Sequence, residues 1–210
     1  MSLVATKPGM TVEEFEALPD GVGYELVDGE LKNRNVSALS SWVGGRLLKL
    51  LSIHVDDNNL GWVFGADNGF QCFADSPRTV RKPDVSFVRA DRLSAEELEK
   101  GWLRVIPDLV VEVISPNDYW DEVNEKVELF HRVGVPLIWV VGVKTRTIQI
   151  TRQDGSFVSL RESDELAGET IVPGFRCRVA ELFPPRKPAD QVPSHDAPLG
   201  VESIADPTKP

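Results

Sequence analysis

The chain has 210 residues, of which 41% are hydrophobic and 27% charged, and this composition is that of one ordinary globular domain, with or without a tail. Its 33 acidic residues outnumber its 23 basic residues and give a formal net charge of −10, which argues against a protein that grips nucleic acid non-specifically through many phosphates. A local basic stripe or bound Mg²⁺ would still allow DNA binding. No apolar run approaches the ~20 residues of a membrane span, and the N-terminus lacks the pattern of a signal peptide, so no membrane association is expected.

The cysteines and histidines exclude two kinds of site. Cys72 and Cys177 are too few for a disulfide framework and form no Cys-x-x-Cys pair, so we expect reduced, packed thiols and a cytoplasmic protein. His54, His131 and His195 are far apart and have no partner at the spacing of zinc ligands. A zinc site is therefore not expected.

The first half of the chain predicts, in order, a short capped helix, a hairpin, an amphipathic helix, two short strands and a small acidic helix. We expect these elements at residues 11–18, 24–31, 40–54, 61–73, 80–88 and 95–100. In the first helix, Thr11 and Glu14 have the spacing of a capping box. The hairpin has an Asp28-Gly29 turn, which suits the left-handed backbone of a two-residue loop.

The second half alternates apolar runs with turn signals. It predicts a buried strand, a helix, a second buried strand and a final hairpin, at residues 109–114, 119–133, 137–143, 147–151 and 157–160. Asn117 or Asp118 could cap the helix. After Phe183 the chain is rich in proline and polar residues, so we expect one domain over residues 1–183 and a disordered tail over 184–210.

Two acidic residues lie within strongly β-prone runs. Asp84 precedes Val-Ser-Phe-Val, and Glu112 lies inside Leu-Val-Val-Glu-Val-Ile. An ionised carboxylate is costly in such a position unless it is paired or holds a metal. Two carboxylates carried to one place by adjacent strands, with a lysine beside them, suit metal-dependent phosphodiester hydrolysis.

Lys126 lies on the predicted helix after the second acid. At about 100° per residue, Lys126 falls within the apolar arc formed by Val123, Val127, Phe130 and Val133. The opposite side carries the charged residues Asp121, Glu125, Glu128 and Arg132. Such a lysine could simply extend along the helix edge to water. Because two strand-borne acids lie just upstream, we favour a lysine directed at them.

Four neighbouring charges allow more than one interpretation. Asp108 is expected to cap or be solvated at the start of its strand, in preference to binding metal. Glu25 could approach the acids, but we favour a solvent-facing position in its hairpin. Arg81 and Lys82 could meet a phosphate or could be charges that protect an edge strand.

Several motifs together resemble a known family. The segments Tyr-Glu-Leu-Val-Asp-Gly-Glu, Arg-Lys-Pro-Asp-Val-Ser-Phe-Val, Pro-Asp-Leu-Val-Val-Glu-Val-Ile-Ser-Pro-Asn-Asp and Ile-Val-Pro-Gly-Phe resemble those of the Uma-two family of restriction-endonuclease-like proteins, within the PD-(D/E)xK nuclease superfamily. The resemblance covers residues 11–183. It implies an α/β fold, with a restriction-endonuclease-like core in which a mixed, mainly antiparallel sheet is flanked by helices. It also implies that Asp84 and Glu112 bind the metal, that the Val113 carbonyl adds a ligand, and that Lys126 is the catalytic lysine.

Four positions depart from the superfamily pattern. Ile114 occupies the usual place of the lysine, two residues after the acid, so the amine must reach over from the helix, as is typical of the Uma-two family. Ser40 replaces a frequent histidine, Phe130 a frequent tyrosine and Gly142 a frequent acid. The two acids and the lysine are thus retained while their surroundings are changed.

The sequence as a whole predicts a Mg²⁺-dependent DNA endonuclease, with Mn²⁺ as the alternative ion and with no organic cofactor. A homodimer is expected because cutting both strands of a duplex requires two sites. A non-catalytic binding module that retains the nuclease fold is the alternative from another class. A metal-dependent phosphodiesterase that acts on RNA is the third possibility.

Overall fold

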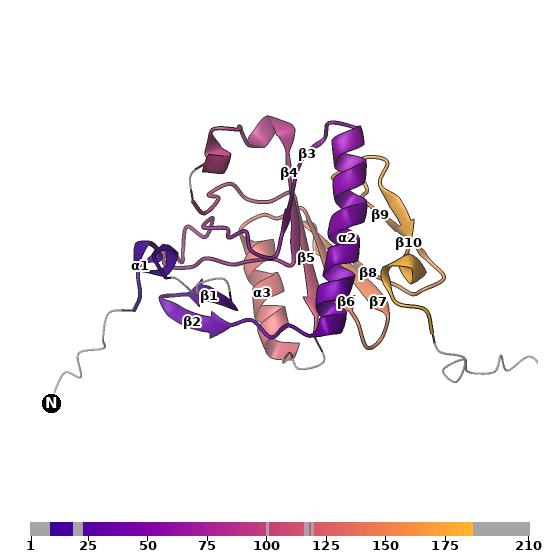
Figure 1. Ribbon diagram of the computed structural model, residues 1–210, viewed down its shortest axis with the longest axis horizontal. Coiled ribbons are helices and arrows are strands. Elements are labelled where there is room, and N and C mark those ends of the chain that lie inside the picture. The colour runs from indigo at the N-terminus through magenta and orange to yellow at the C-terminus, as the bar shows by residue number, and fades with distance from the viewer. Residues whose placement is uncertain (1–8, 19–22, 100, 116–117, 119, 187–210) are drawn as a thin grey trace, which may run out of the picture.

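The computed structural model describes residues 9–18, 23–99, 101–115, 118 and 120–186 (Figure 1). In this part of the chain the central element is a six-stranded sheet of order β3-β4-β5-β6-β7-β8. Its neighbouring strands are antiparallel except for β5 and β6, which are parallel. The expected mixed, mainly antiparallel sheet flanked by helices is confirmed.

The two central strands are the most deeply buried. The sheet consists of β3 (Gly61–Gly65), β4 (Val85–Arg89), β5 (Leu109–Ile114), β6 (Leu137–Gly142), β7 (Thr147–Arg152) and β8 (Phe157–Leu160). Because β5 and β6 are buried on both faces, their residues are apolar without alternation, with Glu112 of β5 as the one charged residue. The strand expected over 80–88 begins only at Val85, since Pro83 has no N–H to donate to a ladder and the backbone bends at Asp84.

Helix α2 (Ala38–Asp57) covers one face of the sheet. Its side chains Val43, Leu47, Leu51 and Val55 are fully buried and follow one another at intervals of four residues, so they form one apolar stripe. The same core includes the C-terminal hairpin of β9 (Glu165–Ala167) and β10 (Arg176–Arg178) and the 3₁₀ turn η4 (Val179–Leu182). In Figure 1 this hairpin lies beside α2.

Helix α3 (Trp120–Arg132) covers the other face and connects the parallel strands β5 and β6. Phe130 is fully buried there, and Val123 and Val127 pack against the same core. The charged residues Asp121, Glu125, Glu128 and Arg132 are exposed. The orientation that the helical periodicity predicts is confirmed.

A small N-terminal unit lies at one end of the sheet. It consists of α1 (Val12–Glu16), which has the expected capping box, and the hairpin of β1 (Tyr24–Val27) and β2 (Glu30–Asn33). Asp28 and Gly29 both have positive φ, 50° and 85°, as the expected Asp-Gly turn requires. A bridge between Leu26 and Val80 joins this hairpin to the segment that leads into β4, which brings its side chains next to Asp84.

The remaining connections include short 3₁₀ turns. These are η2 (Ala90–Arg92) and η3 (Glu97–Glu99). The acidic helix expected at residues 95–100 is therefore only the short turn η3. Asp118 accepts the N–H of Ser115 at 2.6 Å, and Asn117 lies outside the described residues. Among the helices that the structure describes, none combines the length and apolar character of a membrane span.

The predicted tail lies mostly outside the described residues, which end at Arg186. Up to that point the chain is held to the domain, because the carbonyl of Pro184 accepts a hydrogen bond from Arg146 at 3.0 Å and Arg186 pairs with Glu162. The division into residues 1–183 and 184–210 stays a prediction.

Candidate active site

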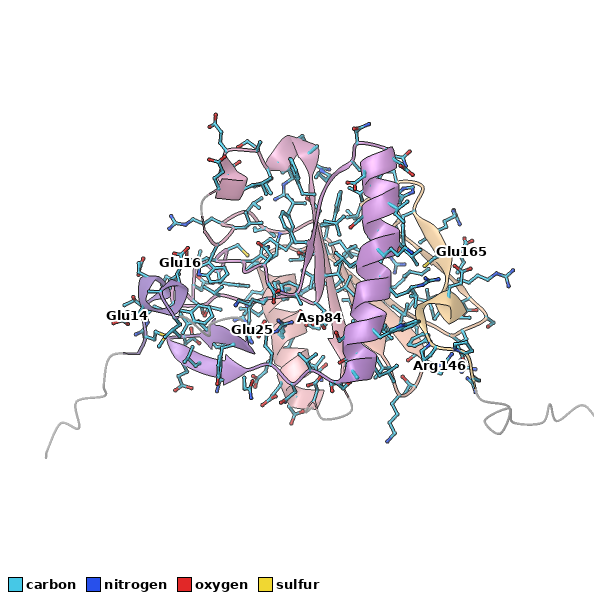
Figure 2. The ribbon with its side chains drawn as sticks, in the orientation of Figure 1. Glu14, Glu16, Glu25, Asp84, Arg146 and Glu165 are labelled. Carbon is cyan, nitrogen blue, oxygen red and sulfur yellow. The ribbon has the colours of Figure 1, made fainter. Side chains whose placement is uncertain are left out.

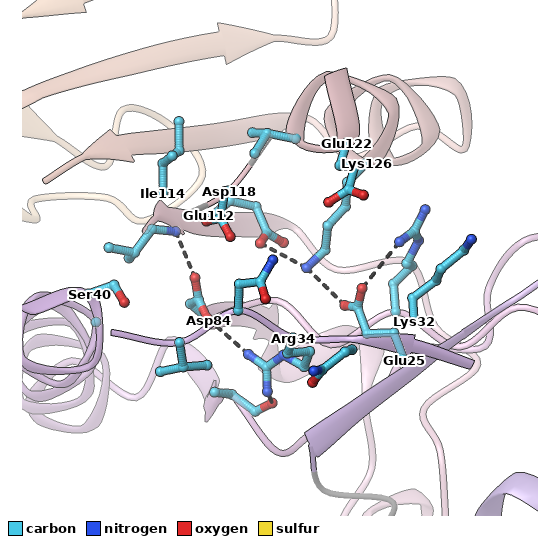
Figure 3. Close-up of a pocket in the computed structure, with 18 of the residues that line it drawn as sticks. Glu25, Lys32, Arg34, Ser40, Asp84, Glu112, Ile114, Asp118, Glu122 and Lys126 are labelled. Carbon is cyan, nitrogen blue, oxygen red and sulfur yellow. Dashed lines mark hydrogen bonds and ion pairs between the residues drawn. The ribbon is translucent and has the colours of Figure 1, made fainter. Parts of the chain in front are cut away.

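The register of β4 and β5 brings the two predicted acids together. Val85 pairs with Val111 and Ser86 with Val110, so one further step places Asp84 opposite Glu112. Oδ2 of Asp84 accepts the N–H of Val113 at 2.7 Å, which holds this carboxylate against β5. Asp84 and Glu112 line the same pocket (Figure 3).

Lys126 reaches this pocket from α3. Its Nζ lies 2.8 Å from Oε2 of Glu112 and 2.8 Å from Oε1 of Glu25, and it donates to the carbonyl of Lys82 at 3.2 Å. An ammonium group has three protons, so these acceptors match its full donor capacity. The lysine therefore points at the acids, with its side chain only 13% exposed.

Glu25 is part of this cluster, and the expected solvent-facing position is wrong. The residue is 5% exposed. Its Oε1 accepts the N–H of Lys82 at 2.6 Å, and its Oε2 lies 3.2 Å from Nη1 of Arg81. Figure 2 shows Glu25 between the N-terminal hairpin and the centre of the molecule. Local alternation could not reveal this, because Glu25 is buried by the distant segment that carries Lys82; the hairpin motif of the resembled family was the available signal.

Neither interpretation of Lys82 is correct, since this side chain is only 1% exposed. Its Nζ lies 5.1 Å from the ring centre of Phe15 and 4.8 Å from that of Trp102, which is cation–π geometry. Lys82 thus belongs to the N-terminal core, while its neighbour Arg81 lines the pocket and pairs with Glu25.

Arg34 is a site residue that the sequence did not reveal. It follows directly after β2, and its Nη2 lies 2.9 Å from Oδ1 of Asp84. Its Nη1 donates to the carbonyl of Ala66 at 2.7 Å, and the side chain is 11% exposed. With Val113 on the other oxygen, Arg34 fixes both oxygens of Asp84.

Burial sets the protonation behaviour of the cluster. Burial raises the pKa of Glu112 to about 8; Lys126 opposes this change, and the negative charges of Asp84 and Glu25 add to it. Burial also acts to lower the pKa of Lys126, but Glu112, Glu25 and Asp84 outweigh it and leave that pKa raised. Burial acts to raise the pKa of Glu25, yet the cations Lys126 and Arg81 leave it lowered.

The chemistry of the donors fits a hard divalent cation. Oε1 of Glu112 is buried and has no hydrogen-bond partner within the described residues. A bound metal cation would give this oxygen the partner that it lacks. Carboxylate and carbonyl oxygens of Asp84, Glu112 and Val113 are the ligands that Mg²⁺ prefers, together with water. No cluster of three or more His, Cys, Asp or Glu residues suited to a metal occurs in the described ranges.

Asp108 lies apart from this set, as expected for an acid that is not a metal ligand. Its carboxylate accepts the N–H of Arg89 at 2.9 Å and pairs with Arg92 at 2.7 Å. It is 4% exposed, so arginine, and not solvent, compensates its charge.

The pocket has a volume of about 780 Å³ and a rim of mixed charge. Lys32, beside Arg34, contributes a basic side chain from β2. The opposite wall carries the acidic residues Asp118, Glu122 and Glu125. Two basic side chains, Lys32 and Arg34, thus come from the hairpin side, and Lys126 enters from α3 (Figure 3).

A family model described as "Putative restriction endonuclease", Uma2, matches residues 12–180. The chain belongs to the Uma2 family. The chain is also similar to the solved structure of a "putative nuclease belonging to DUF820" from Anabaena variabilis, with a TM-score of 0.69 and 16% identity. The match covers 83% of the present chain and 97% of the Anabaena chain. At this identity the likeness shows the fold, and it confirms the expected α/β core. A comparison with curated proteins gave no match.

In this Uma2 protein two of the four positions that depart from the expected pattern, Ile114 and Ser40, line the pocket that holds the acids. Ile114 lines the pocket at the usual lysine position, and Ser40 lines it from the first turn of α2, where it also completes a capping box with Ser37. Phe130 lies in the core beneath α3. The amine therefore comes from α3, and the position of the frequent histidine serves as a helix cap.

Proposed function

We propose that this Uma2 protein is a metal-dependent endonuclease that hydrolyses DNA phosphodiester bonds. The observation that carries the proposal is the meeting of Asp84, Glu112 and Lys126 in one pocket, with Oε1 of Glu112 buried and unpartnered by the described residues. The nuclease descriptions of the family and of the structural neighbour support the same class of reaction.

Asp84, Glu112 and the carbonyl of Val113 would hold Mg²⁺, or Mn²⁺ as the alternative ion. When bound, such an ion supplies Lewis acidity for water activation and for stabilisation of the leaving oxygen. Lys126 keeps a positive charge next to the acids and orients Glu112 through its 2.8 Å contact. Its contact with the Lys82 carbonyl is its longest, at 3.2 Å, so this is the bond that the ammonium would exchange for a water or a phosphate oxygen.

A non-catalytic binding module is the second candidate, and two observations favour it. Lys126 already contacts three protein acceptors, and one wall of the pocket carries Asp118, Glu122 and Glu125. A repulsive wall of this kind weakens the approach of a polyanion. Cleavage of RNA instead of DNA is the third candidate and uses the same groups.

We further propose a homodimer, because double-strand cleavage needs two such sites, and a cytoplasmic location. Cys72 and Cys177 are both free thiols, which accords with a reducing compartment. Sedimentation of the purified chain at several concentrations measures the first of these proposals, and a monomer that cuts both strands would contradict it.

A cleavage assay tests the function. The full chain would be incubated with plasmid DNA, single-stranded DNA or RNA, with Mg²⁺, Mn²⁺, Ca²⁺ or EDTA. We expect cleavage of DNA with Mg²⁺ or Mn²⁺, none with EDTA, and none by Asp84→Asn. Asp121→Asn, which alters an exposed acid of α3, serves as the matched control. A folded protein that cleaves none of these nucleic acids with any of the metals would instead support the binding module.

A further inference from the structure

We propose that Arg34 is a positioning residue that exchanges Asp84 for a substrate phosphate, so that the binding of metal and the binding of phosphate assist each other. The inference rests on the proposed function, since it takes Asp84 as a metal ligand. It adds a residue and a coupling that neither the family description nor the sequence motifs assign.

The first support is the contact geometry of Arg34. Its two terminal nitrogens are divided between Oδ1 of Asp84, at 2.9 Å, and the carbonyl of Ala66, at 2.7 Å. The guanidinium lines the same pocket as Glu112 and Lys126. A cation held by Asp84 would therefore lie next to the guanidinium of Arg34, and Figure 3 shows how Arg34 and Asp84 are arranged.

The second support is the balance of charge in the ion-paired cluster. The carboxylates of Asp84, Glu112 and Glu25 contact the cationic groups of Arg34, Arg81 and Lys126. In their ionised forms these three acids and three bases compensate one another. A divalent cation added to this buried cluster leaves excess positive charge, which is unfavourable in a medium of low dielectric constant. An anionic phosphodiester in the same pocket would remove the excess.

Arg34 is the cation best suited to this exchange. Arg81 contacts Glu25, which lies outside the proposed metal ligands. Lys126 divides its contacts between Glu25, the Lys82 carbonyl and the ligand Glu112, whereas the carboxylate partner of Arg34 is the ligand Asp84. With a metal bound to Asp84, the guanidinium of Arg34 would lose this carboxylate as the partner that compensates its charge. The planar fork of an arginine can then donate two hydrogen bonds to phosphate oxygens. Lys32, on the same side of the pocket, adds to the positive potential there.

The test measures metal affinity and DNA affinity separately in Arg34→Gln, which keeps a hydrogen-bond donor but removes the charge. By calorimetry with Mn²⁺ and no DNA, we expect this variant to bind the metal about fivefold or more tightly than wild type. With a short duplex in Ca²⁺, we expect the metal to strengthen DNA binding about fivefold or more in wild type and to lose that effect in the variant.

Two further variants make the result decisive. Arg92 lies away from the pocket, and its Nη1 is 2.7 Å from Oδ1 of the buried Asp108. Arg92→Gln therefore also removes an arginine from a buried aspartate, and it should leave the Mn²⁺ affinity at the wild-type value. Arg34→Lys restores the charge without the fork, so it should bind Mn²⁺ as weakly as wild type but hold the duplex less tightly. If Arg34→Gln does not fold, as judged by circular dichroism, the split between metal and duplex affinity in Arg34→Lys tests the exchange.

Failure of the inference and failure of the proposed function differ in outcome. Mn²⁺ binding that depends on Asp84 but is unchanged or weakened in Arg34→Gln overturns the exchange and makes Arg34 a brace for Asp84. If neither the wild type nor Asp84→Asn binds Mn²⁺, the metal site itself is overturned, and the exchange with it.

Discussion

The change of Lys126 to methionine separates its catalytic role from its structural role. Lys126→Met keeps an unbranched apolar stem and removes the ammonium that lies 2.8 Å from both Glu112 and Glu25. Glu25 retains Arg81 and the N–H of Lys82, so the loss falls mainly on Glu112. Removing one partner of a buried ion pair costs about 3–5 kcal/mol, and we expect about 3 kcal/mol at pH 9, because only one acid loses its partner.

The loss of stability should depend on pH. Burial raises the pKa of Glu112 to about 8 from an ordinary value of 4.5, and without Lys126 this pKa rises further. A group whose pKa is raised in the folded state contributes stability that is fully present below its unfolded pKa and is lost as pH rises through its folded pKa. Lys126→Met should therefore be destabilised less at pH 6, where Glu112 is neutral, than at pH 9.

Urea denaturation at pH 6 and pH 9 measures this difference, and the cleavage assay measures the other role. We expect activity to fall by ~10²-fold or more, as when one preorganised charge-stabilising group is lost. Lys126→Met/Glu112→Gln should recover stability at pH 9 but not activity. Lys49→Met, on the exposed surface of α2, is the control. Full activity, or an equal loss of stability at both pH values, would refute the reasoning.

Three other predictions concern the site and the C-terminus. Because Glu112 must lose its proton to bind metal, the affinity for Mn²⁺ should rise from pH 6 to pH 8, and binding should release protons. Calorimetry in buffers of different ionisation enthalpy measures this proton release. An Mn²⁺ affinity that does not depend on pH would contradict the prediction. Glu25→Gln keeps an acceptor for the Lys82 N–H but removes a charge that holds Lys126. Activity should therefore fall about tenfold, while the dissociation constant for Mn²⁺ changes little. Weaker Mn²⁺ binding would instead indicate that Glu25 is a metal ligand. Removal of residues 187–210 should leave the melting temperature unchanged in calorimetry, since Arg186 and Pro184 still make their contacts; loss of soluble protein would show that this segment packs on the domain.

Local patterns in the sequence were enough to predict most of the fold and to propose Asp84, Glu112 and Lys126 as a candidate site. The apolar runs of β5 and β6, the Asp28-Gly29 turn and the apolar face of α3 depend on periodicity and turn chemistry within a few residues. Lys126 could be oriented because its helix has one apolar face, and that face must meet the sheet.

Tertiary structure alone decided what surrounds them. Arg34 meets Asp84 across 50 residues of chain, and Glu25 meets Lys82 across 57. These contacts exist because the bridge between Leu26 and Val80 places the N-terminal hairpin against the segment before β4. A single charged residue in a short strand or after it carries no local sign of such a partner, since its burial is set by the distant segment that covers it.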